Sequence, residues 1–205
     1  NLLLVVLNTI VVRLVLPMSA VQWAAWCAER GIGALNFVGA GLPFAVQVVV
    51  ACLGLELIIY WQHVVFHYVP WLWRLHRVHH ADLDLDVTSG TRFHFIEIII
   101  SLAIKFASIA LLGASALAVL IFEIVLNVMA MFNHSNVAIP VWIDRWLRLL
   151  GVTPDMHRVH HSVVVRETNS NFGFNLPIWD RLFRTYVAEP TGGQTGMVIG
   201  LPEVL

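Results

Sequence analysis

The chain has 205 residues, of which 59% are hydrophobic and only 12% are charged, and its mean hydropathy is +0.78. Soluble domains carry about 25% charged residues, so this composition predicts an integral membrane protein. The formal net charge of -1 excludes the concentrated basic surface that nucleic-acid binding requires. The two cysteines, Cys27 and Cys52, form no CxxC or CxxCH pattern, which excludes a zinc ribbon and covalently attached c-type haem.

Two hydrophobic stretches in the N-terminal part are candidates for membrane-spanning helices. The first covers about residues 1–16 and ends at Pro17, so it is shorter than the roughly 20 residues that cross a bilayer. We therefore expect the natural chain to begin further upstream. Residues 18–41 combine tryptophans with glycines, as is typical of an interfacial connection. The second span covers about residues 42–61 and leads directly to His63.

Two more apolar stretches, roughly residues 95–112 and 114–132, are predicted to form a helical hairpin. If the two helices are antiparallel about position 114, Lys105 lies nine residues before that position and Glu123 nine residues after it. The two charged residues then lie at the same depth. Because an unpaired charge inside a membrane costs several kcal/mol, we expect an ion pair between them.

The chain after His134 is expected to stay outside the hydrocarbon. Residues 139–186 are amphipathic, rich in Trp and Arg and interrupted by prolines. We therefore expect short helices on the membrane surface that cover the end of the bundle where His134 emerges. The Gly/Pro-rich tail that follows is expected to be extended. Most arginines belong to the side where His134 emerges, whereas the opposite side offers Arg30 and Arg13. The positive-inside rule therefore predicts that the His134 side is cytoplasmic.

Eight of the ten histidines fall into three clusters with helical spacing. Residues four apart lie on one face of a helix, so the two histidines of HxxxH, and the first and last of each HxxHH, point the same way. The middle histidine of HxxHH flanks that face, so one helix could supply ligands to two metal ions. His94 and His134 lie twenty residues before and after position 114, and we expect them to emerge together. The clusters are His63 and His67, then His76, His79 and His80, and finally His157, His160 and His161.

So many neutral imidazoles on one side of a membrane predict a metal centre. Imidazole suits iron, zinc and copper, and ten donors are enough for two ions with about five each. We favour iron over zinc, because structural zinc sites commonly use thiolates that are missing here, while an open iron site can activate oxygen. Zinc can nevertheless occupy such sites in purified protein. Side chains that could orient the imidazoles are Glu56, Asp82, Glu97, Asn133, Asp155 and Asp180.

These patterns predict an all-α membrane protein with a single domain over residues 1–205. It has about four transmembrane helices and a cytoplasmic helical cap that carries the histidine clusters. Six segments between Leu55 and Tyr186 resemble the fatty acid hydroxylase/sterol desaturase superfamily of membrane di-iron enzymes. These segments are WQHVVFH, LWRLHRVHH, TRFHFIE, FNHSN, TPDMHRVHHS and NFGFNLPIWDRLFRTY.

The resemblance implies that the eight clustered histidines bind an iron pair, with His94 and His134 as further ligands or close neighbours of ligands. It also implies oxygen as co-substrate and a separate electron donor that is cytochrome b5-like or ferredoxin-like. One departure is Arg184, which stands where members usually have Gly, so the terminal turn is expected to be built differently. The tail PTGGQTGMVIGLPE resembles bacterial members, which favours a bacterial inner membrane over the endoplasmic reticulum.

The leading hypothesis is an oxygen-dependent hydroxylase or desaturase that acts on a membrane lipid. Both outcomes share this histidine pattern, and sterol, carotenoid, fatty acyl, alkylglycerol and ornithine-lipid substrates all remain open. The alternative is a non-catalytic membrane protein that binds haem or binds and transports metal ions. Haem would need single histidines that face each other at mid-membrane depth, and the ligands of a transporter would be spread along a path. A Ser/His/Asp hydrolase is excluded because the sequence contains no nucleophile elbow.

Overall fold

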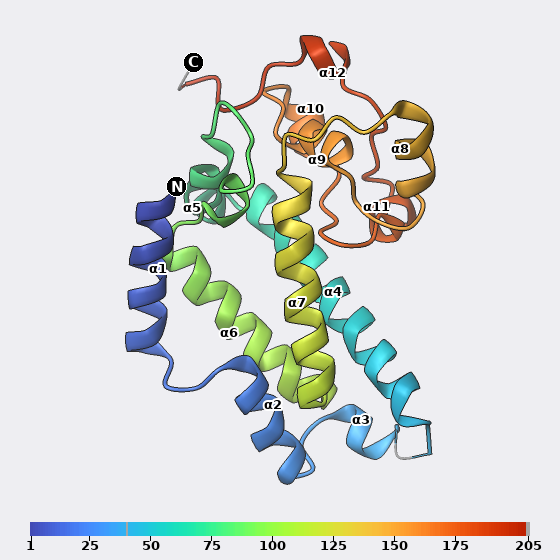
Figure 1. Cartoon of the computed structure of the whole chain (residues 1–205). Helices are drawn as coiled ribbons and strands as arrows, with labels where there is room; N and C mark the ends of the chain where they lie inside the picture. Colours follow the sequence, from blue (N-terminus) through green and yellow to red (C-terminus); the bar gives the residue numbers. More distant parts are fainter. Residues whose placement is uncertain (40, 204–205) are drawn as a thin grey trace.

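The computed structural model describes residues 1–39 and 41–203, and every regular element within these ranges is helical. α4, α6 and α7 each have the length and hydropathy of a membrane span, and α1 with α2 forms a fourth candidate over Leu2–Glu29 (Figure 1). The prediction of an all-α membrane protein with about four spans is confirmed. The helices of this bundle are α1 (Leu2–Val15), α2 (Ala20–Glu29), α3 (Ala34–Phe37), α4 (Phe44–Tyr68), α6 (Phe95–Leu112) and α7 (Ala116–Asn133).

α2 is a packed helix, in contrast to the interfacial connection expected for residues 18–41. Ser19 starts it with a capping box, because its hydroxyl accepts from the Gln22 N–H while the Gln22 side chain accepts from the Ser19 N–H. Trp23 Nε1 donates a hydrogen bond of 2.9 Å to the backbone oxygen of Phe106 in α6. α2 therefore lies against the hairpin of α6 and α7.

α6 and α7 form the predicted antiparallel hairpin. Gly113 ends α6 with φ at 71°, the left-handed conformation that glycine adopts most readily. Ser115 then caps α7 by accepting a hydrogen bond from the Ala118 N–H. Between the two helices, Lys105 Nζ donates to Glu123 Oε1 at 2.9 Å. The ion pair expected from their equal depth is confirmed.

The apolar core lies where α2, α4, α6 and α7 meet, and alanine is its commonest residue. Small side chains let helix backbones approach closely, which favours association of helices in a membrane, where lipid is as apolar as the helix surface. The core consists of Ala20, Ala24, Ala51, Leu55, Ile109, Ala114, Ala118, Val119 and Phe122.

α4 continues to Tyr68, seven residues beyond the predicted end of its span at about residue 61. It ends there because the next residue precedes Pro70, and a residue before proline is pushed into an extended conformation. Pro70 then opens α5 at a position where its missing N–H is not needed. α4 therefore carries His63 and His67 beyond the apolar core on one continuous helix.

The short helices that follow α4 gather at the end of the bundle where α1 begins (Figure 1). α8 is exposed, as expected of a surface helix, with Trp142 71% and Trp146 67% exposed. α9 contradicts that expectation, because Met156 and Val159 are fully buried where it packs against α7 and α10. The short elements are α5 (Pro70–His80), the 3-10 helix η1 (Ser89–Thr91), α8 (Val141–Leu147), α9 (Pro154–His160), α10 (Val165–Thr168), α11 (Ile178–Leu182) and α12 (Gly193–Gly196).

The C-terminal tail folds back onto the end of α9, whereas the sequence predicted an extended tail. Ser162 and Ile199 form an isolated antiparallel bridge, and the Gly200 N–H donates to the His161 backbone oxygen at 3.1 Å. The short helix α12 interrupts the tail before this bridge. Backbone hydrogen bonds therefore tie the tail to the segment that carries the last HxxHH pattern.

Candidate metal centre

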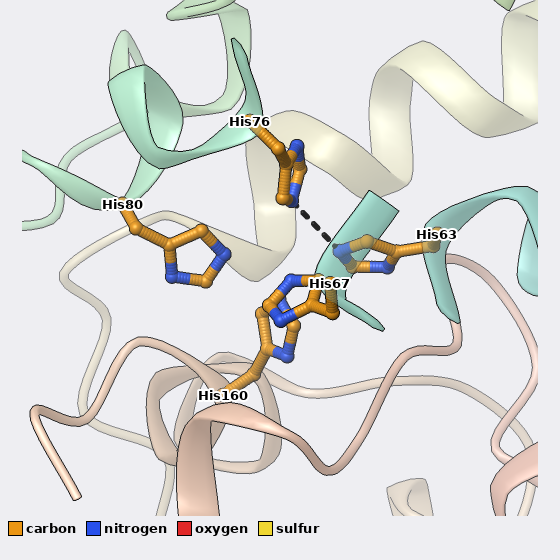
Figure 2. A group of neighbouring side chains, drawn as sticks. All are labelled: His63, His67, His76, His80 and His160. Atoms are coloured by element: carbon orange, nitrogen blue, oxygen red, sulfur yellow. Dashed lines mark hydrogen bonds between the residues drawn. The ribbon is translucent and has the colours of Figure 1, made fainter. Parts of the chain in front are cut away.

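Nine of the ten histidines are buried in two groups, and within each group one possible ligand atom per residue lies within 4.8 Å of all the others. Histidines of α4, α5 and α9 form the first group (Figure 2). The second draws on α5 and on the C-terminal ends of α7 and α9. The five-histidine group consists of His63, His67, His76, His80 and His160, and the four-histidine group of His79, His134, His157 and His161.

Each HxxHH segment contributes to both groups. In α5, His76 and His80 belong to the five-histidine group, whereas His79 between them belongs to the four-histidine group. α9 divides in the opposite sense, because its middle histidine, His160, joins the five-histidine group and the outer two join the other. The groups are direct neighbours, since the rings of His80 and His161 stack with their centroids 4.4 Å apart.

In the five-histidine group, four of the five rings have Nδ1 within hydrogen-bonding distance of an oxygen. A contact at one ring nitrogen fixes which nitrogen carries the proton. Here Nδ1–H donates outward, so the lone pair of Nε2 is available inside the group. The contacts are His63 with the Phe172 backbone oxygen (2.8 Å), His67 with Asn169 Oδ1 (3.2 Å), His76 with Glu97 Oε1 (2.6 Å) and His160 with the Ser170 backbone oxygen (2.7 Å).

The inner nitrogens of this group are not satisfied by the protein. Nε2 of His63 lies 3.1 Å from Nε2 of His76 (Figure 2), although both rings already use their proton at Nδ1. Nε2 of His67 and of His160 is buried without a hydrogen-bond partner among the described residues. Buried acceptors without partners are costly. A cation between these lone pairs would satisfy them, so the donor set fits a metal ion.

The four-histidine group shows the same crowding of nitrogens. Nε2 of His134 lies 3.1 Å from Nε2 of both His79 and His157, while its Nδ1–H donates to the Ala130 backbone oxygen at 2.7 Å. Burial lowers the pKa of His134 to about 4 and that of His160 to about 3. These imidazoles are therefore neutral at physiological pH, which is the form that binds metal ions.

Residues 169–176, here called the anchoring loop, supply three of the four Nδ1 contacts in the five-histidine group. Asp180 of α11 fixes the middle of the loop. Its carboxylate accepts hydrogen bonds from the N–H groups of Phe172 and Gly173 at 2.8 and 2.9 Å. The same carboxylate accepts from the Thr185 hydroxyl at 2.7 Å. Asp180 therefore orients imidazoles through the backbone of the loop, without touching them.

The membrane-spanning helices hold the other end of the anchoring loop. Glu56 Oε1 in α4 accepts from the Leu176 N–H at 2.7 Å, and Asn133 Nδ2 in α7 donates to the Phe174 backbone oxygen at 2.7 Å. Of the residues expected to orient imidazoles, only Glu97 forms a side-chain hydrogen bond to one in the part of the chain that the structure describes. Asp82 and Asp155 form no side-chain hydrogen bond to a clustered histidine within the described ranges.

His94 lies outside both groups, although its depth matches that of His134. Its Nδ1 accepts a hydrogen bond from the Ile96 N–H at 3.2 Å and so caps the N-terminus of α6. Its ring stacks on Phe95, with the centroids 4.6 Å apart. Equal depth on a hairpin does not fix the direction of a side chain around the helix. His94 is therefore not part of either histidine group, and a role for it at the metal centre stays a prediction.

A cavity of about 260 Å³ lies between α4, α6 and α7 and reaches both histidine groups. His63 and His76 of the five-histidine group line it together with His134 of the four-histidine group. Phe66 and Phe93 contribute to its apolar wall. Because these helices are candidate membrane spans, the cavity connects the imidazoles with the interior of the bundle.

The fatty acid hydroxylase family model matches residues 48–185, which is more than half of the chain. The chain belongs to the fatty acid hydroxylase family. All nine clustered histidines and the anchoring loop lie within the matched range. No solved structure matches the chain.

Curated relatives of this family member oxidise different lipids, according to their names. The ornithine lipid hydroxylase OlsE of Rhizobium tropici is 36% identical over 77% of this chain and 46% of its own length. The alkylglycerol monooxygenase of Xenopus tropicalis is 33% identical over 67% of this chain and 30% of its own length. The cholesterol 25-hydroxylase of Rattus norvegicus is 27% identical over 86% of this chain and 57% of its own length. The chain thus spans about half or less of most of these relatives.

This member of the fatty acid hydroxylase family carries an arginine at the position where the sequence pattern favours glycine. Arg184 follows α11 with φ at 61°, in the left-handed region that glycine adopts with least strain. The next residue, Thr185, closes the turn by donating its N–H to the Asp180 backbone oxygen at 2.8 Å. The turn that glycine would favour is therefore kept, although a different turn was expected.

Proposed function

We propose that this protein is an oxygen-dependent lipid hydroxylase that holds two iron ions, one in each histidine group. The observation that carries the proposal is the pair of buried imidazole groups at an apolar cavity between membrane-spanning helices. Family membership supports it, and the relatives are named as hydroxylases or monooxygenases of lipids. These names favour hydroxylation over desaturation.

Iron bound in the two groups would supply the activation of dioxygen that oxidation of an unactivated C–H bond requires. The nine clustered histidines would be its ligands, in their neutral form. The Nδ1 contacts keep the Nε2 lone pairs of the five-histidine group inward, and the aromatic walls of the cavity exclude water from the bound lipid. Zinc can fill the same donor set, so a purified sample has to be loaded with iron before its activity is measured.

The substrate that fits the cavity best is a lipid with an acyl or alkyl chain. The cavity volume of about 260 Å³ lies slightly below the ~300–1,000 Å³ of pockets that bury drug-sized ligands. It accommodates a segment of a single chain more readily than a fused ring system. We therefore favour acyl or alkyl lipids over sterols.

Oxygen-dependent hydroxylation also needs electrons, and we propose that a separate donor supplies them. The chain has only two cysteines, whereas an iron–sulfur cluster commonly needs four thiolates. The clustered histidines are already assigned to the two iron sites. A cytochrome b5-like or ferredoxin-like protein would supply the missing redox group.

We propose that the histidine end of the bundle faces the cytoplasm. The short helices at that end carry several arginines, including Arg74, Arg158 and Arg181, whereas Arg30 follows α2 near the opposite end. Cytoplasmic loops of membrane proteins are enriched in Lys and Arg. The bacterial relative OlsE supports a bacterial inner membrane as the setting.

Mass spectrometry of lipids from a bacterial host grown under ¹⁸O₂ tests the proposed activity. With the wild-type protein we expect a lipid that carries one heavy oxygen atom from the gas. His160→Ala and His157→Ala, one in each histidine group, should abolish the labelled product. Absence of label in cells that contain iron-loaded wild-type protein would contradict the proposal, and so would wild-type labelling in either variant.

The haem alternative is separated by a visible absorption spectrum of the purified protein. A haem would need two facing histidines as axial ligands. Within each group, however, the other imidazoles lie close to any such pair, because all ligand atoms lie within 4.8 Å of one another. This arrangement has no room for a porphyrin ring between two axial histidines. We expect no Soret band, and a Soret band that scales with protein concentration would favour the alternative.

A further inference from the structure

A stripe of polar side chains runs along the cavity from the histidine end into the membrane-spanning helices. Glu97, Ser101 and Lys105 follow one another at intervals of four residues along α6 and all line the cavity. Gln62 of α4 and Asn127 of α7 line it from the neighbouring helices. Residues four apart share a helix face, so α6 presents a polar stripe to the cavity.

Lys105 is the cation of this stripe, and it has hydrogen-bonding capacity left over. An ammonium group has three N–H donors, and only the bond of 2.9 Å to Glu123 Oε1 uses one of them among the described residues. By contrast, Gln62 and Ser101 already pair with each other, at 2.9 Å. The Lys105 side chain is only 15% exposed. A charged group at this depth requires partners, from protein, water or a ligand.

The distance between the ion pair and the histidines is fixed by α6. Glu97 contacts His76 at 2.6 Å, and Lys105 lies eight residues further along the same helix. At 1.5 Å per residue the two positions are separated by about 12 Å along the helix axis. The cavity runs between them, since residues at both positions line it.

We propose that Lys105, neutralised by Glu123, binds an uncharged polar group of the lipid substrate, such as a hydroxyl or an ester or amide carbonyl. Because Lys105 and Glu97 occupy fixed positions on α6, the bound group is held at a fixed distance from the histidine end of the cavity, so this contact selects the carbon that is oxidised. A free carboxylate is disfavoured, because the negative charge of Glu123 is already next to the ammonium. The inference deepens the proposed function and rests on it for the oxidation step.

Binding of 1-decanol and of decane to the purified full-length protein tests the contact without turnover. Both chains are long enough to extend along the cavity, and only the alcohol offers an acceptor to Lys105. We expect wild-type protein to bind decanol at least about 10-fold more tightly than decane, since hydrogen bonds to charged groups contribute in this range. Lys105→Met should remove the preference, and Lys105→Arg should retain it.

Trp23→Phe is the matched control, because it removes a hydrogen bond between α2 and α6 whose two residues, Trp23 and Phe106, do not line the cavity. We expect it to lower thermal stability and to leave the preference for decanol unchanged. If Lys105 serves only to hold α6 and α7 together, Lys105→Met will lower thermal stability but keep the preference, and the proposal is then overturned. Equal binding of decanol and decane by the wild-type protein would overturn it as well, without any variant.

The position of the oxygen in the host lipid provides the second test. In the wild-type product, we expect the new oxygen at one fixed number of carbons from a polar group, whatever the length of the remaining chain. Lys105→Met should spread the oxygen over several carbons at unchanged iron content. A single unchanged position in Lys105→Met would contradict the proposal. Absence of any oxidised lipid from wild-type cells would instead contradict the hydroxylase function, and the decanol experiment would still test the binding site.

Discussion

At the scale of single residues, the partner of the outer ring nitrogen distinguishes one clustered histidine from another. Most Nδ1 contacts in the five-histidine group are to uncharged oxygens, whereas His76 is bonded to the carboxylate of Glu97 at 2.6 Å. A hydrogen bond to a carboxylate is stronger than one to a carbonyl, so it fixes the orientation of the imidazole more strongly. We therefore expect Glu97 to be the residue outside the histidines on which metal affinity depends most directly.

Glu97→Ala should weaken metal binding about 10–100-fold, the usual cost of losing a partner of a ligating histidine. Glu97→Gln should cost less, because its amide oxygen can still accept from His76 Nδ1. Competition with a chelator, followed by elemental analysis, measures the affinity. Glu29→Gln, which changes an exposed carboxylate on α2, is the control. Metal affinity that is the same in Glu97→Ala and in the control would contradict this role.

The different positions of His94 and His134 give a paired prediction. His134→Ala removes a member of the four-histidine group, so we expect loss of bound metal. His94→Ala removes only a helix cap, which should cost about 0.5–2 kcal/mol of stability and leave the metal content unchanged. Metal content per chain and thermal unfolding of the two variants check this. Loss of metal in His94→Ala comparable to that in His134→Ala would show that the site includes His94.

At the scale of elements, the anchoring loop determines where three imidazoles point. Gly173 is required in it, because a Cβ at this position would lie 2.8 Å from Asp180 Oδ2 and 2.9 Å from the Leu176 backbone oxygen. Asp180 Oδ2 is also the atom that accepts from the Gly173 N–H. A side chain at this position has to displace the loop or the Asp180 carboxylate.

Gly173→Ala should therefore lower both thermal stability and metal retention, although it changes no ligand. Gly196→Ala in α12 is the matched control, because a Cβ there meets no atom within 4 Å. Thermal unfolding and metal content of the two variants, purified in parallel, make the comparison. If Gly173→Ala retains metal as well as Gly196→Ala does, the loop does not control the orientation of the histidines.

The sequence correctly predicted those elements whose ends are marked by the limits of an apolar run or by a helix-breaking residue. The hairpin of α6 and α7 and the Lys105–Glu123 ion pair follow from antiparallel geometry alone, and both were found. The extension of α4 to Tyr68 was missed because hydropathy falls after residue 61, while the helix continues until Pro70. Burial of α9 was missed because it depends on tertiary packing, and an amphipathic pattern does not distinguish a lipid surface from a protein surface.

The composition of the site was predictable from histidine spacing, but its orientation was not. Each HxxHH segment contributes to both groups, as helical periodicity had indicated, whereas the binding of two ions stays a prediction. The contacts that orient His63 and His160 come from backbone oxygens of Phe172 and Ser170. Every residue has such an oxygen, so no residue type marks these positions in the sequence. Only the segment NFGFNLPIWDRLFRTY, quoted for its resemblance to the family, included part of this loop.

At the scale of the whole molecule, the histidines connect segments that are far apart in the sequence. α4, α5 and the C-terminal ends of α7 and α9 together supply the histidines of the two groups, beyond the apolar core. Without metal, several buried ring nitrogens there have no partner among the described residues. A metal ion that binds the folded state and not the unfolded chain therefore stabilises the whole end of the bundle.

Removal of metal with a chelator should lower the unfolding temperature of the purified protein by several degrees. Binding at 100 times the dissociation constant contributes about 2.7 kcal/mol, which for a chain of this size corresponds to roughly 5–10 °C. Differential scanning calorimetry in detergent, before and after re-addition of iron, measures the effect. The same treatment of a His157→Ala and His160→Ala double variant should leave its unfolding temperature unchanged.

Iron content per chain, measured by elemental analysis on protein purified from iron-supplied cells, tests most directly that the two groups form two metal sites. We expect two iron ions per wild-type chain, with a loss in His160→Ala and a loss in His157→Ala. A wild-type protein that saturates at one ion or fewer per chain, or variants that keep the full wild-type content, would contradict the two-site account.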